Sequence, residues 1–204
     1  MKYNIKYRLI TTGDSLRDFS KKNLFRILVF SSFVIFGFIV GISIGIKAED
    51  ASPSIMAMNW LMGSYAVNNM NLFLYFALKF IVFALIILLF ISVSQNIYLS
   101  FVYYLTLFFI GLSLGGPIII LFRLFGLSAI FIAIIGFFIF EIIYASIFVL
   151  FASSMLCIAV EKHKYGCIVD MKKLMKDMYQ ILILAGALIL FQTIVLFICS
   201  VFIL

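Results

Sequence analysis

The chain has 204 residues, of which 66% are hydrophobic, 18% aromatic and only 11% charged. An average soluble domain is about half apolar and about a quarter charged, and it could not cover this much apolar surface with polar groups. A soluble enzyme or a secreted module is therefore excluded. The long uncharged runs contain only two prolines and favour helices over a transmembrane barrel, whose strands alternate polar and apolar positions. We predict an all-α, polytopic membrane protein.

The membrane spans follow from the runs without charge, because a helix that crosses a bilayer needs about 20 mostly apolar residues. Five spans are predicted, at about residues 27–46, 72–93, 97–115, 127–160 and 178–203. The first is expected to stay in the mature protein, because its apolar core is longer than that of a cleavable signal.

Two of these boundaries depend on local sequence. The uncharged run of residues 80–122 is too long for one crossing, so we place a bend at Ser94-Gln95-Asn96. Glycine and proline are poor helix formers, so we expect Gly115-Gly116-Pro117 to end the third span. Residues 127–160 allow either one long tilted helix or a short re-entrant piece before a full span.

The basic residues give the spans a direction, since Lys and Arg of short loops stay on the cytoplasmic side. Residues 1–26 carry seven basic residues against two acidic ones, and residues 161–177 carry five against three. Both segments are predicted to be cytoplasmic, which requires that residues 127–160 cross once. Residues 47–71 and the C-terminus are then outside the cell membrane, and residues 27–204 form one transmembrane domain. The net charge of +7 indicates topology and attraction to anionic membrane lipid rather than nucleic-acid binding.

Glycines recur every four residues in two spans, and this spacing leaves a smooth helix face on which another helix can approach closely. The first span has Gly37, Gly41 and Gly45, and the third has Gly111 and Gly115. We favour packing of these faces within one chain. The alternative is a seam with another membrane protein or with a second copy in a homo-oligomer.

Lys79, Arg123 and Glu141 are the ionisable residues inside or beside the apolar zone, where charge is costly and points to function by default. Arg123 is expected in a short outer turn after Pro117, where it can reach headgroups, and the stem of Lys79 can carry its charge outward. Glu141 shares a helix face with small residues and is expected to point into the bundle. Lys79 and Glu141 would pair if the fourth helix is tilted or starts late. Such a pair is either a proton or ion relay or, as we favour, one polar contact that fixes helix register.

The sequence offers little chemistry for catalysis. His163 and Cys167 stand alone on the second basic segment, without the further pair that a zinc site needs. Nucleotide-binding, hydrolase and metalloprotease motifs are not found. We therefore predict a protein that is not an enzyme and has no catalytic, cofactor-binding or metal-binding residues.

The order of these parts resembles the stage II sporulation protein M family. The resemblance lies in a basic start, a glycine-spaced first span, an outer loop of about 25 residues and a paired hydrophobic block. Its segments are Phe36-Gly37-Phe38-Ile39-Val40-Gly41, Phe73-Leu74-Tyr75-Phe76-Ala77-Leu78-Lys79-Phe80, Phe109-Ile110-Gly111-Leu112-Ser113-Leu114-Gly115, Phe122-Arg123-Leu124-Phe125-Gly126-Leu127-Ser128 and Ala152-Ser153-Ser154. The chain departs from the family at Phe138-Ile139-Phe140-Glu141, where relatives often carry proline, and at the end of the last span.

The resemblance implies a non-enzymatic scaffold in the cell membrane that recruits or anchors peptidoglycan-remodelling enzymes, such as cell-wall hydrolases, during sporulation engulfment. The alternative is a membrane subunit of a transporter or export system that works with a separate ATPase. That alternative would be supported by a cytoplasmic coupling helix, for which residues 170–179 are the candidate.

Overall fold

The computed structural model describes residues 21, 23–47, 72–125, 138–165 and 171–203. Nearly all of these residues are helical and none is in a strand, which confirms the all-α prediction. The elements in chain order are α2 (Leu24–Lys47), α4 (Leu72–Ser94), the short 3₁₀ helix η1 (Ile97–Leu99), α5 (Phe101–Phe125), α7 (Ile139–Tyr165) and α8 (Met171–Ile203).

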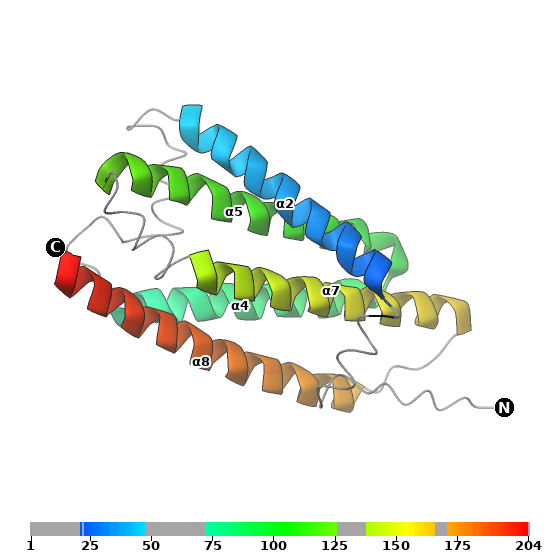
Figure 1. Cartoon of the computed structure of the whole chain (residues 1–204). Coiled ribbons are helices and arrows are strands. Elements are labelled where there is room, and N and C mark those ends of the chain that lie inside the picture. The colour runs from blue at the N-terminus through cyan, green and yellow to red at the C-terminus, as the bar shows by residue number, and fades with distance from the viewer. Residues whose placement is uncertain (1–20, 22, 48–71, 126–137, 166–170, 204) are drawn as a thin grey trace.

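The helices are long and apolar enough for a multi-pass membrane protein. Four stretches of the described residues could cross a bilayer, namely Leu24–Lys47, Phe76–Ser94, Ile97–Gly116 and Ile139–Lys164, and a shorter apolar stretch of α8 covers Tyr179–Val195. Successive helices run in alternating directions along one bundle (Figure 1). One end of the bundle therefore holds the starts of α2, α5 and α8 together with the ends of α4 and α7. Because Arg26 and Lys162 lie there, we call it the basic end.

The bend predicted at Ser94-Gln95-Asn96 is present. Helix α4 ends at Ser94, and Asn96 starts η1 by accepting a hydrogen bond from the Tyr98 backbone N–H at 3.0 Å. A polar side chain at such an N-cap satisfies an amide that has no partner within the helix. The chain then reverses into α5, so that α4 and α5 form an antiparallel pair of crossings.

The apolar stretch of the third span ends at Gly116, close to its predicted end, but the helix does not end there. Helix α5 continues through Gly115-Gly116-Pro117 to Phe125, and Arg123 lies in its last turns rather than in a turn after Pro117. The glycines of this segment allow α2 to approach: a Cβ on Gly115 would lie 2.2 Å from the Phe38 carbonyl oxygen. Membrane helices tolerate proline and glycine where neighbouring groups compensate for the lost backbone bond.

In the fourth predicted span, residues 127–160, the structure describes helix α7. Helix α7 begins at Ile139, so Glu141 lies in its first turn instead of the middle of a crossing. Residues 126–137, where a re-entrant piece would have to lie, are outside the described residues. The late start of α7 brings Glu141 to the depth of Lys79 in α4, as the next section describes.

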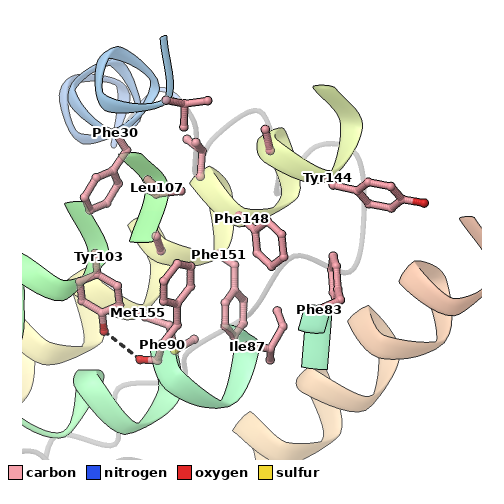
Figure 2. Packing of buried hydrophobic residues seen from close by; sticks show 14 of the residues in the cluster. Phe30, Phe83, Ile87, Phe90, Tyr103, Leu107, Tyr144, Phe148, Phe151 and Met155 are labelled. Carbon is pink, nitrogen blue, oxygen red and sulfur yellow. Dashed lines mark hydrogen bonds between the residues drawn. The ribbon is translucent and has the colours of Figure 1, made fainter. Parts of the chain in front are cut away.

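The core of the bundle is built from aromatic side chains of α4, α5 and α7 (Figure 2). Phe83 packs on Phe148 with ring centroids 4.6 Å apart, and Phe90 meets the edge of Tyr103 at 5.2 Å. The Tyr103 hydroxyl donates a hydrogen bond of 2.9 Å to the Phe90 carbonyl, so the one polar atom of that ring is satisfied in the interior. These contacts fill the middle of the bundle with apolar atoms.

Candidate functional site

The glycine faces of α2 and α5 are packed against each other within one chain. A Cβ on Gly37 would lie 2.1 Å from the Phe108 carbonyl oxygen, and one on Gly111 would lie 2.0 Å from the Val34 carbonyl oxygen. Both distances are far below van der Waals contact, so only glycine fits. Gly41 and Gly45 meet backbone atoms of α5 in the same way. A partner therefore cannot use these faces while α2 and α5 remain together.

Lys79 of α4 and Glu141 of α7 form an ion pair inside the bundle. Their side chains are only 20% and 16% exposed, so both are largely shielded. Pairing reduces the cost of placing each charge at membrane depth, because neither has to be desolvated without a partner. The pair joins two helices, and its two residues are 62 positions apart in the sequence.

A third helix completes this polar cluster, which comprises Lys79, Glu141, Tyr144 and Gln192. The Lys79 ammonium donates a hydrogen bond of 2.7 Å to Gln192 Oε1 of α8, and Gln192 is fully buried. The ammonium also lies 4.8 Å from the centroid of the Tyr144 ring, within range of a cation–π interaction. One lysine therefore links α4, α7 and α8 at the end of the bundle opposite the basic end.

Gln192 was not singled out from the sequence. It lies within the uncharged run of residues 178–204, between Phe191 and Thr193. An amide side chain deep in an apolar span is costly unless it is hydrogen-bonded. This cost could have indicated from the sequence that Gln192 has a polar partner inside the bundle. Which residue it would bond could not be read from the sequence, because nothing there places α8 beside α4.

The basic end has its own polar contacts. The Lys162 ammonium of α7 donates to both the backbone carbonyl and the side-chain oxygen of Gln95, at 3.2 and 2.9 Å, and so caps the end of α4. On α2, the Arg26 guanidinium donates to Asn23 Oδ1 at 2.9 Å and lies beside the Cys157 thiol of α7. A cation at the last carbonyls of a helix is favourable because of the helix dipole.

The remaining predicted residues do not join a site in the part of the chain that the structure describes. His163 is exposed and its ring meets that of Tyr98, with centroids 6.0 Å apart. Cys167 lies outside the described residues, and nothing is described of the side chains of Arg123 and Cys199. Within the described ranges no three His, Cys, Asp or Glu side chains are grouped so that they could hold a metal ion.

Comparison with known proteins adds no relative. No protein-family model, no curated protein and no solved structure matches this chain. The findings support an all-α, multi-pass membrane protein in which Lys79 and Glu141 of the described residues are joined in one cluster.

Proposed function

We propose that this chain is a non-enzymatic membrane scaffold that recruits or anchors partner proteins. The observation that carries the proposal is that Lys79 pairs with Glu141 and donates a hydrogen bond to Gln192, all within the chain. The ion pair holds three helices in register, which is a structural role. In such a chain the paired charges stabilise the packing of its own helices, and its outer surfaces are left to contact other proteins.

A transport path along the bundle is disfavoured by the core between its two polar ends. Lys79 and Gln95 are separated by about 24 Å along α4, and the aromatic cluster fills the interior between them. The buried serine hydroxyls near this core bond to their own helices: Ser94 donates to the Ile91 carbonyl and Ser153 to the Val149 carbonyl. An ion route needs a succession of polar groups that face one path, and these hydroxyls do not form one.

The candidate coupling helix of the transporter alternative is continuous with a helix of the bundle. Residues 171–178 are the first turns of α8, and they continue directly into the apolar part of that helix. A separate cytoplasmic helix that could dock on an ATPase is not found among the described residues.

The resemblance noted in the sequence supports peptidoglycan-remodelling enzymes as the partners, acting at the cell membrane during sporulation engulfment. The positive-inside rule supports a cytoplasmic N-terminus and an external C-terminus. Because the glycine faces are occupied internally, the partner surface has to lie elsewhere. Within the predicted outer loop of residues 47–71, residues 48–71 are outside the described residues.

The proposal is tested by purifying the tagged full-length chain from its native host in a mild detergent. An unrelated tagged multi-pass protein serves as the control for adventitious binding. We expect a cell-wall hydrolase to be enriched at a constant ratio to the chain, and no substrate flux in proteoliposomes that contain the purified complex. Recovery of an ATPase together with ATP-dependent flux would favour the transporter subunit, and the absence of any enriched partner would contradict the scaffold.

A further inference from the structure

An apolar groove lies between α2 and α7, and its floor includes Leu114 of α5. Its volume is about 500 Å³, within the range of about 300 to 1,000 Å³ found for ligand pockets. One face of each helix lines the groove, with Ile27, Val34 and Phe38 from α2, Ile142 and Val149 from α7, and Phe138, which directly precedes α7.

The groove exists because small residues stand where the two helices face each other. Ser31, Ala145 and Ser146 leave space that larger side chains would fill. The Ser146 hydroxyl donates to the Ile142 carbonyl at 2.8 Å, so this polar group is satisfied by its own helix. Ile35 and Ile142 are exposed along the open side, which in a membrane faces lipid. These walls suit a hydrocarbon chain.

The length of the groove matches one leaflet of a bilayer. From Ile27 to Phe38 it extends about 16 Å along α2, whereas half of a hydrocarbon core of about 30 Å is about 15 Å. The far end is closed by Phe38 and Phe138, whose ring centroids are 6.2 Å apart. A transmembrane helix of a partner would need a seam across both leaflets, and the groove is too short for that.

The open end lies at the basic end of the bundle. Arg26 directly precedes Ile27 and its guanidinium is partly buried between α2 and α7, where it contacts Asn23 and lies beside Cys157. A guanidinium carries five N–H donors in a geometry that suits phosphate.

The charges at this end are mostly positive. Near the start of α2 and the end of α7, Lys21, Lys162 and Lys164 add positive charge and Glu161 opposes it. Helix α8 starts at the same end with Lys172, Lys173 and Lys176 against Asp177. Basic pockets between membrane helices on the cytoplasmic side bind anionic headgroups.

We infer that this groove is a binding site for an anionic phospholipid of the leaflet at the basic end. One acyl chain lies between α2 and α7 and the phosphate lies at Arg26. The inference rests on the membrane fold and not on the scaffold function, so either can fail without the other. A bound lipid would fill the space between α2 and α7 and stabilise their contact.

The test uses the full-length chain in nanodiscs of phosphatidylcholine that contain a small fraction of phosphatidylglycerol with a photoreactive acyl chain. We expect the label to concentrate on residues 27–38 and 138–150. Ser146→Trp, which fills the groove, should remove most of this label, whereas Leu85→Trp on the exposed face of α4 should not. Ser31→Leu provides a smaller obstruction in case Ser146→Trp does not fold, and helicity by circular dichroism identifies that case.

The headgroup is tested by repeating the experiment with photoreactive phosphatidylcholine. Arg26→Gln should lower the preference for phosphatidylglycerol about fivefold, the equivalent of roughly 1 kcal/mol for one basic residue. Lys47→Gln, which removes an exposed charge at the other end of α2, is the matched control. Label spread evenly over α4 and α8, equal labelling by both lipids, or cross-linking of the groove to another protein would each overturn the inference.

Discussion

The closest contacts in the bundle predict that Gly37→Ala destabilises the fold. An added Cβ would lie 2.1 Å from the Phe108 carbonyl oxygen, while ordinary contact begins near 3.4 Å, so the helices must separate locally by about 1.3 Å. The obstacle is backbone and cannot rotate away. The cost should therefore be near the upper end of overpacking, about 3 kcal/mol. Alanine recovers about 1 kcal/mol in helix propensity, which leaves a net loss of about 2 kcal/mol.

Gly186→Ala is the matched control for this substitution. A Cβ on Gly186 of α8 would lie 3.3 Å from a ring carbon of Phe80, a side chain that can shift by a few tenths of an ångström. The same gain in helix propensity then leaves this variant as stable as the wild type or slightly more stable. Both variants add one methyl group to a glycine in an apolar helix, so they differ mainly in what the methyl group meets.

The measurement is reversible unfolding of the full chain in mixed micelles, followed by circular dichroism. A Gly37→Ala variant that is as stable as Gly186→Ala would refute the packing argument. The oligomeric state decides between the two interpretations of the glycine face. If this face were a seam between copies, Gly37→Ala would change the assembly size and leave the unfolding of the monomer unchanged.

Three further substitutions follow from other contacts. Lys79→Met should lower the free energy of unfolding by about 3 kcal/mol, because it leaves the shielded Glu141 carboxylate without its ion-pair partner. The double variant with Glu141→Leu should lose less stability than the single one. A larger loss in the double variant would contradict the pairing. Tyr103→Phe should cost about 1 kcal/mol through the lost bond to the Phe90 carbonyl, while Tyr98→Phe, whose ring is exposed, should unfold like the wild type. Lys162→Met should speed amide hydrogen exchange in the turn after α4. It should lower the global free energy of unfolding by less than about 1 kcal/mol, because the contacts of Lys162 with Gln95 are exposed. Unchanged exchange would show that the cap is not formed.

The long apolar helices could be predicted because charge is expensive in lipid and its absence marks each apolar run. The bend after Ser94 was also predictable, since three polar residues interrupt an apolar run. The end of α5 was not, because helix propensities measured in water rank Gly and Pro as breakers. In this bundle the same glycines allow α2 to approach α5, and that tertiary contact outweighs the local preference.

The polar cluster shows a similar division between local and tertiary information. Lys79 and Glu141 stand out in the sequence because each is a charge within an apolar run. Their pairing depends on where α7 begins, and a hydrophobic run of residues 127–160 does not contain that information. Gln192 depends in addition on which helix lies beside α4, and that order is set by packing across the whole bundle.

The ion pair also determines which substitution can separate a scaffold from a transporter. Glu141→Gln removes a charge that a relay would need, but it also leaves the Lys79 ammonium facing a neutral group in a shielded site. Loss of activity in that variant would therefore report on stability as well as on transport. A variant with Lys79→Met and Glu141→Leu removes both charges and leaves no unpaired charge. Partner binding retained in this double variant would agree with a scaffold, because the pair then serves only helix register. Flux that is present in the wild type and lost in a folded double variant would require the charges themselves.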